Sequence, residues 1–132
     1  MSYTDRPQLV TFSLRTADMA GVPADDADLF AILIAPGREV EIQSFNAVVR
    51  LAGAASSFIE LCKEDDTVIA KVPVSATGNV SSVQSDGTTA QTYPQRIAPQ
   101  SATLLKQLKF KVGGTLDATT DVDLQFVVTN MK

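Results

Sequence analysis

Apolar and polar residues alternate with a period of two along much of the chain. The clearest example lies near its end, where every second residue is apolar, namely Val122, Leu124, Phe126 and Val128. Successive side chains of a β-strand point to opposite faces, so this alternation predicts a strand with one buried face. The same pattern predicts strands over residues 10–15 and 107–112.

Two apolar segments between these strands are less regular. Residues 29–34 form a continuous apolar run that ends at a Pro-Gly pair, which predicts a short strand buried on both faces. Between residues 40 and 51 the apolar phase changes around Gln43-Ser44. An extra residue turns every later side chain to the other face, so we predict a β-bulge there. Two short strands with a bend between them are the alternative.

The clearest hairpin spans residues 57–74. Residues 57–63 and 67–74 predict two strands joined by an acidic turn, and Pro73, which has no amide donor, indicates a strand end or a sheet edge. Residues 75–92 are rich in Ser, Thr, Gln, Gly and Asn and contain the turn dipeptide Asp86-Gly87. This composition predicts a protruding hairpin or a surface loop.

These segments give about eight strands within a single all-β domain. Long connections over residues 16–28 and 75–92 suit crossings between two sheets, so we predict an antiparallel two-sheet sandwich, with a jelly roll favoured. An immunoglobulin-like sandwich is the main rival, although the chain lacks the cysteine pair and the tryptophan of that family. We assign residues 1–8 to an extended N-terminal arm and residues 9–132 to the sandwich.

Composition limits the possible partners. The chain has 132 residues and a net charge of −4, so it has no surplus of positive charge to neutralise a phosphate backbone, and we expect no nucleic-acid partner. No apolar run approaches the roughly 20 residues that span a bilayer. The first residues lack the basic start and apolar core of a signal peptide, so we expect synthesis in a cytoplasm. Cys62 is the single cysteine and permits no internal disulfide.

Catalytic chemistry has few candidates. The chain contains no histidine, which excludes Ser-His-Asp and Cys-His sites and disfavours zinc. We interpret Cys62 as a packing residue, because no partner base is evident. Glu39, Glu41 and Glu60 are candidates for a carboxylate pair, but their alternation with apolar neighbours favours solvated strand faces. We therefore predict a protein that is not an enzyme and has no catalytic or cofactor-binding residues.

Calcium is the remaining metal to consider, because it prefers oxygen ligands. Acidic residues are frequent in turns and at strand edges, where they also keep a protein soluble. None of the acidic groups has the spacing of an EF-hand loop, so we predict no metal site. The three groups are Asp25-Asp26-Asp28, Glu64-Asp65-Asp66 and Asp117-Asp121-Asp123.

A few residues are candidates for contact with another protein. Lys109 and Lys111 share a strand face opposite the core phase, which indicates either a solvated face or a contact patch for an acidic protein surface. Val127 stands among polar residues on the outer face of the last strand, which indicates a subunit contact or a lone exposed valine. Tyr3 and Arg6 in the arm are further candidates, since an extended arm can add a strand to a neighbouring sheet.

The whole-chain pattern joins a short polar arm at Ser2 to Gln8 to about eight strands, with Ser- and Thr-rich loops and no histidine. In these features the chain resembles the small jelly-roll decoration, or cement, proteins of tailed-bacteriophage heads. The resemblance implies a virion protein on the capsid exterior that binds the major capsid protein across subunit junctions. It also implies a homo-oligomer, with a trimer favoured.

Two other functions stay open. One is a carbohydrate- or receptor-binding module of a phage fibre or surface protein, in which Tyr93 would offer a surface for stacking sugars. The other is a small hydrolase that works through two facing carboxylates. We favour structural assembly over the binding module, and both over the enzyme.

Overall fold

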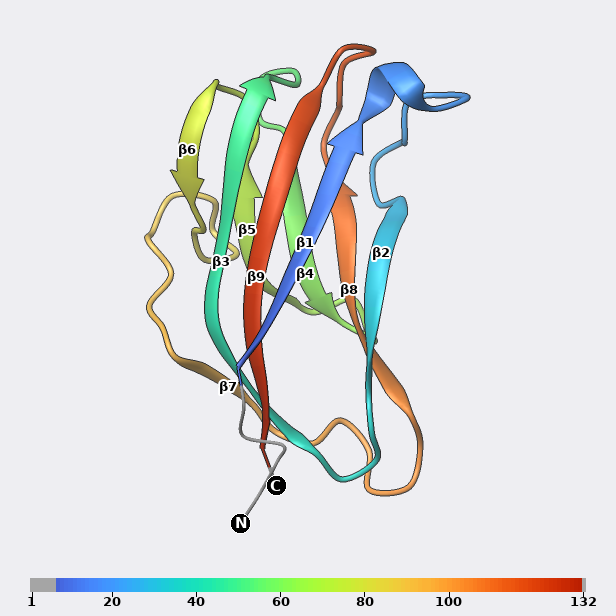
Figure 1. Ribbon diagram of the computed structural model, residues 1–132, viewed down its shortest axis with the longest axis vertical. Coiled ribbons are helices and arrows are strands. Elements are labelled where there is room, and N and C mark those ends of the chain that lie inside the picture. The colour runs from blue at the N-terminus through green and yellow to red at the C-terminus, as the bar shows by residue number, and fades with distance from the viewer. Residues whose placement is uncertain (1–6, 132) are drawn as a thin grey trace.

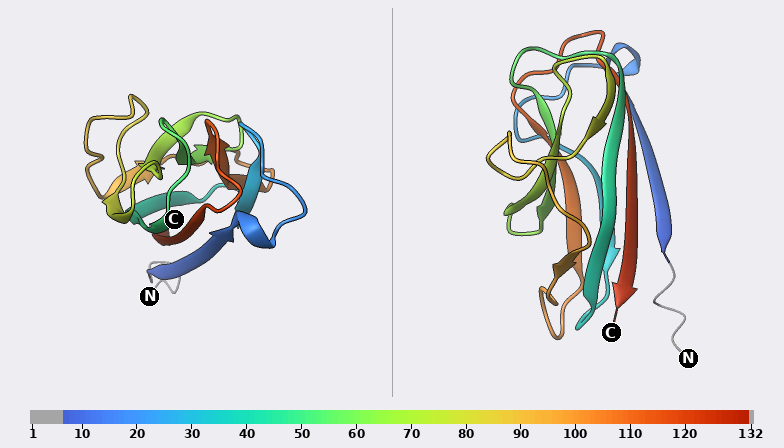
Figure 2. Two further views of the ribbon diagram at one scale, coloured as in Figure 1. Left: turned by 90° about the horizontal axis from the view of Figure 1, so that it is seen from above. Right: turned by 90° about the vertical axis from the view of Figure 1, so that its left-hand side faces the viewer.

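The computed structural model describes residues 7–131, which form two antiparallel β-sheets packed face to face (Figures 1 and 2). Nine strands are found in this range, one more than the expected number of about eight. They are β1 (Gln8–Arg15), β2 (Asp28–Ile34), β3 (Glu39–Leu51), β4 (Phe58–Lys63), β5 (Val68–Pro73), β6 (Gly78–Ser81), β7 (Gln95–Ile97), β8 (Lys106–Gly113) and β9 (Asp121–Met131).

The strand order is that of a jelly roll. Sheet A has the order β1-β9-β3-β6, with β7 also paired to β3, and sheet B has the order β2-β8-β4-β5. The first half of the chain therefore pairs with the second half, as β1 with β9, β2 with β8, β3 with β6 and β7, and β4 with β5. Such a long hairpin rolled into two sheets is the jelly-roll arrangement, so the sandwich and its favoured topology are confirmed.

The core lies between the inner faces of the two sheets. In β9 the apolar residues of the alternating set are all buried, and Phe126 contacts Phe110 of β8 with ring centroids 5.3 Å apart. Phe45 of β3 packs edge-on against both rings. Face-to-face sheets are held together by such interdigitation of inward side chains, so the period-two pattern fixes which face of each strand is buried.

The phase change in the third strand is a β-bulge. Ile42 pairs with Val128 and Ser44 pairs with Val127, which leaves Gln43 as the extra residue of an otherwise continuous strand β3. The Gln43 side chain donates a hydrogen bond to Thr129 Oγ1 at 2.8 Å. The bulge is therefore confirmed, and the alternative of two short strands is wrong.

Three expectations about single elements need correction or extension. Strand β2 is not buried on both faces, because it lies at the edge of sheet B and Leu33 on its outer face is 61% exposed. Strand β7, which pairs with β3, lies in a segment for which the sequence pattern predicted no strand. The connection over residues 16–28 begins with a 3₁₀ turn at Thr16–Asp18.

The hairpin over residues 57–74 is confirmed as β4 and β5, with Pro73 at the end of the edge strand β5. The polar segment that follows folds back over sheet B, where Val83 exchanges backbone hydrogen bonds with Lys71 at 2.9 and 2.7 Å. The predicted N-terminal arm falls largely on residues 1–6, which lie outside the described residues, as do the candidates Tyr3 and Arg6. Its last residue, Gln8, already belongs to β1.

Candidate interaction surface

Of the three carboxylates considered for acid–base chemistry, two lie side by side on sheet A and one lies on sheet B. Glu39 and Glu41 lie on sheet A and pair with Arg96 of β7 at 3.7 and 3.2 Å. Glu60 lies on the outer face of sheet B, 3.9 Å from Lys71, and burial raises its pKa although Lys71 opposes this shift. A glycosidase needs two carboxyl groups that face each other across a cleft, and these three do not form such a pair.

The acidic groups considered for calcium are held by protein donors. Asp25 accepts a hydrogen bond from the Gly114 N–H at 2.8 Å, and Asp65 accepts one from the Thr67 N–H at 3.0 Å. Among residues 7–131 no group of three or more His, Cys, Asp or Glu side chains could hold a metal ion.

The two candidate lysines do not form the solvated face that the sequence indicated. Their side chains are only 13% and 11% exposed, and both ammonium groups contact Asp66, Lys109 at 2.6 Å and Lys111 at 3.1 Å. Hydrogen bonds from these lysines lower the pKa of Asp66. The turn between β4 and β5 brings Asp66 over the strand face, so one carboxylate contacts both ammonium groups and the two lysine side chains are largely covered.

Cys62 lies beneath this cluster, across from Lys109 in the pairing of β4 with β8. It is buried, and desolvation raises the pKa of its thiol to about 11. Because the thiolate is the reactive form, this thiol is poorly suited to nucleophilic chemistry at neutral pH.

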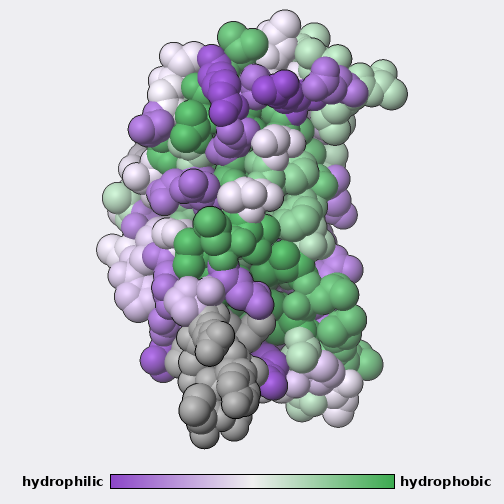
Figure 3. Space-filling model, in the orientation of Figure 1, coloured by the Kyte–Doolittle hydropathy of each residue, from purple (hydrophilic) through white to green (hydrophobic). Residues whose placement is uncertain are grey.

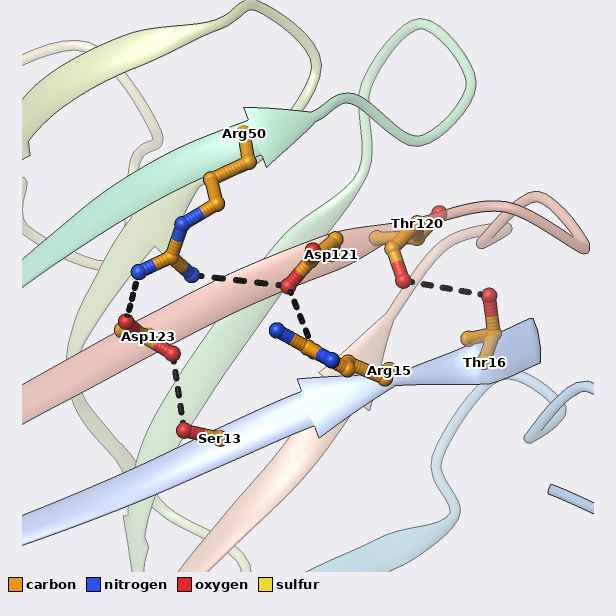
Figure 4. Close-up of polar contacts among 7 residues, drawn as sticks. All are labelled: Ser13, Arg15, Thr16, Arg50, Thr120, Asp121 and Asp123. Carbon is orange, nitrogen blue, oxygen red and sulfur yellow. Dashed lines mark hydrogen bonds and ion pairs between the residues drawn. The ribbon is translucent and has the colours of Figure 1, made fainter. Parts of the chain in front are cut away.

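A ladder of charged side chains crosses the outer face of sheet A (Figure 4). Arg50 of β3 hydrogen-bonds Asp123 of β9, which also accepts a hydrogen bond from Ser13 Oγ of β1 at 2.7 Å. Asp121 lies between Arg50 at 3.5 Å and Arg15 at 3.6 Å. The hydrogen bonds from Arg50 and Ser13 lower the pKa of Asp123 to about 2. The charges balance within the ladder, so it ties β1 to β9 and β3.

One side of the sandwich exposes apolar side chains along its length. Strands β1 and β2 are the neighbouring edges of the two sheets, and Phe12 stacks on Phe30 across the gap with ring centroids 5.4 Å apart. We call this the β1–β2 side, and its apolar residues the apolar strip. Figure 3 shows apolar surface over the middle of β1 and along β2. The strip's exposed members are Leu9 on the outer face of sheet A, Leu33 on the outer face of sheet B, and Met19 and Val22 in the connection between β1 and β2. Between them lie the half-buried Val10, Phe12, Leu29, Phe30 and Ile32, which pack against the core.

The strip also contains a hollow of about 500 Å³, which Phe12, Met19 and Leu29 line together with Arg15 and Asp18. Val127 is half-buried on the outer face of β9, directly across from Leu9 of β1. Of the contact residues predicted from sequence that the structure describes, Val127 is therefore the one that borders the strip. The other residues of the strip were not predicted; two signals could have identified two of them, since Leu9 breaks the alternation of the first strand and Leu33 lies in an uninterrupted apolar run.

Comparisons of the chain with protein-family models, with curated proteins and with solved structures found no match. No helix among the described residues is long and apolar enough to cross a membrane.

Proposed function

We propose that this protein is a non-enzymatic structural component of a phage virion, which binds the outside of the capsid and cements neighbouring major capsid subunits. The observation that carries this proposal is the apolar strip beside two edge strands. Monomeric proteins rarely expose long apolar patches, and such patches commonly mark surfaces that bind other proteins. A jelly roll with a dense aromatic core is also a rigid carrier for such a surface.

The chemistry of the described residues supports an assembly function over catalysis. Glu39 and Glu41 are both paired with Arg96 on one strand face, Glu60 lies on the other sheet, the cysteine is buried, and the ladder on sheet A is neutralised within the chain. The alternative function as a sugar-binding module gains little from the structure. Tyr93 is half-buried, its hydroxyl hydrogen-bonds Ser82, and its ring packs against the core, so only part of the ring is left to line a surface hollow with Glu41 and Gln43.

The proposal is tested on purified particles of the phage that carries this gene. Quantitative mass spectrometry should find the protein in a fixed ratio to the major capsid protein, and gold-labelled antibodies should bind the outer surface of intact heads. A tail protein of known copy number serves as the control. Labelling of fibres would instead support receptor binding, and absence of the protein from the particle would end the proposal.

A further inference from the structure

The direction of the free backbone groups on β1 follows from its pairing with β9. The Thr16 N–H donates to the Thr120 carbonyl at 3.0 Å, and Thr16 and Thr120 continue the register of the two strands. In antiparallel pairs, hydrogen-bonded and non-hydrogen-bonded positions alternate. Even-numbered residues of β1 therefore bond to β9, and the N–H and C=O groups of the odd-numbered ones point away from the molecule. These residues are Leu9, Thr11, Ser13 and Arg15.

No described strand pairs with this outer edge of β1. Natural edge strands are normally protected by a proline, by charges, by short length or by a covering loop. Strand β1 has eight residues, and from Gln8 to Leu14 it contains neither a charge nor a proline. Its residues are mostly of the β-branched, aromatic and aliphatic kinds that pair well in sheets. The edge is thus ready to accept another strand.

We propose that two copies of this chain associate through their β1 strands, paired antiparallel about a two-fold axis at Phe12. This inference assigns to a second copy of the chain the same apolar strip that supports the proposed function, and sedimentation of the purified chain tests it separately from the particle analysis above. It predicts a dimer, whereas the resemblance to decoration proteins favoured a trimer. The pairing joins the two copies of sheet A into one continuous sheet.

The register follows from the free backbone groups. An axis at Phe12 pairs Leu9 with Arg15 of the second copy and Thr11 with its Ser13, so all the outward-pointing residues form hydrogen-bonded pairs. An axis at Thr11 would leave Arg15 opposite Pro7 of the second copy, and proline has no N–H to donate. An axis at Ser13 would leave Leu9 without a partner in β1. Among these three axes, only the one at Phe12 places all the outward-pointing residues of β1 in hydrogen-bonded pairs.

The side chains that meet across the axis are compatible with this register. Even-numbered residues of both copies face sheet B, so Val10 of one copy meets Leu14 of the other and the Phe12 rings meet at the axis, each stacked on its own Phe30. On the outer face, Leu9 lies against the aliphatic part of Arg15 of the second copy. No like charges stand opposite each other in the pairing, which matters for a chain with a net charge of −4.

The ends of the strip also match. Leu9 and Leu33 lie at one end of the molecule, and Met19 and Val22 follow the other end of β1, so the two-fold axis brings unlike ends together. A stable interface buries about 800 Å² on each partner. The chain exposes 6922 Å² in total, so the dimer must cover roughly a ninth of its surface. The β1 edge and the apolar side chains beside it would have to supply this area.

Sedimentation of the full chain tests the proposal directly. The wild-type protein should sediment as a dimer of twice 14.0 kDa. Thr11→Pro removes an outward N–H that has no partner among residues 7–131, so it should raise the dissociation constant at least about tenfold while the monomer keeps its fold, as seen by circular dichroism. Thr11→Val keeps the N–H and is the matched control, with an unchanged dissociation constant. A wild-type monomer or trimer would overturn the proposal, as would a dimer that both variants leave intact.

A cross-linking experiment tests the register even if Thr11→Pro fails to fold. Under oxidation, a mixture of Thr11→Cys and Ser13→Cys chains should form a disulfide-linked dimer, because directly paired residues have Cα atoms about 5.5 Å apart, within disulfide range. Thr11→Cys alone should not, because Thr11 of one copy lies diagonally from Thr11 of the other. The buried Cys62 leaves little background. A cross-linked dimer of Thr11→Cys chains alone would contradict the axis at Phe12. The mixture of Thr11→Cys and Ser13→Cys chains would contradict it too if it formed no cross-linked dimer.

Discussion

On the side of the sandwich where β5 and β6 lie, the chain protects its own edges, whereas the β1–β2 side is left open. Strand β5 ends at Pro73, and Val83 pairs with the backbone of Lys71, whose ammonium group lies 4.4 Å from the centre of the Phe58 ring. Strands β6 and β7 are too short to template another strand. Strand β1 is longer than any of these edge strands, and among the residues that the structure describes none of these protections covers it.

The two sides of the sandwich differ in how their unpaired strand edges are protected. Unpaired edges invite association, and barrels remove them by closure, but a sandwich must deal with them on both sides. Here the polar segment over residues 82–91 closes one side. The other side keeps an apolar edge, which gains stability only when another chain covers it. Specific association is the expected purpose of such an asymmetry.

The largest loss of stability should come from a substitution in the core, and a matched substitution on the β1–β2 side should cost less. Phe110 contacts Phe30, Phe45 and Phe126, so Phe110→Ala should lower the free energy of unfolding by about 3–5 kcal/mol. Phe12 is half-buried in the monomer, so Phe12→Ala should cost about half as much. Urea unfolding at a concentration low enough for the monomer to dominate gives both values.

At higher protein concentration the stability losses of Phe12→Ala and Phe110→Ala should respond differently. A dimer that forms through Phe12 links stability to protein concentration, so the cost of Phe12→Ala should grow as dimers of the wild type accumulate. The cost of Phe110→Ala should change much less. Equal costs for the two variants at low concentration would mean that Phe12 is as well packed as the core.

Much of the fold was accessible from the sequence because it depends on local alternation. The alternation of Leu124 and Phe126, the phase change at Gln43 and the hairpin ending at Pro73 each report the faces of one strand or one turn. Strand β7 was missed because three residues are too few to show a period. The exposure of Leu33 was missed because an apolar run does not reveal whether its strand lies inside a sheet or at its edge.

The surface was harder to predict, because it depends on segments distant in sequence. Lys109 and Lys111 lie on the outer face as their phase required, yet Asp66 of another turn covers them. Nothing in the spacing of these residues specifies that contact. Val127 was recognisable from its place among polar residues, but the importance of its position appears only when β1 places Leu9 across from it.

Asp123 and Glu60 should change the free energy of unfolding with pH in opposite directions, and each effect should be of intermediate size. The pKa of Asp123 is lowered to about 2 in the folded chain, so its contribution to stability is present above the ordinary aspartate pKa of about 3.9 and is lost as pH falls toward 2. Because the side chain is about one-third exposed, we expect roughly 1 kcal/mol. Asp123→Asn should remove this loss from a series of unfolding curves between pH 2 and 5.

Glu60 should behave in the opposite way. Burial raises its pKa, so the folded chain holds this proton more tightly than the unfolded chain, and stability falls as pH rises through the folded pKa. Glu60→Gln should flatten the profile above the ordinary glutamate pKa and leave the acid limb due to Asp123 unchanged. If both variants altered the same limb, the assignment of the two environments would be wrong.

The smallest effect on stability should accompany a clear effect on association. Leu9 is 64% exposed on β1 and Leu51 is 52% exposed at the end of β3, which β9 separates from β1. Replacing either exposed leucine with lysine should change the free energy of unfolding of the monomer by less than about 0.5 kcal/mol. In the proposed dimer, however, Leu9→Lys places an ammonium group opposite Arg15 of the second copy, where like charges repel. Sedimentation should therefore show weaker dimer formation for Leu9→Lys and unchanged dimer formation for Leu51→Lys. An equal loss of affinity in both variants would place the interface away from the β1 edge.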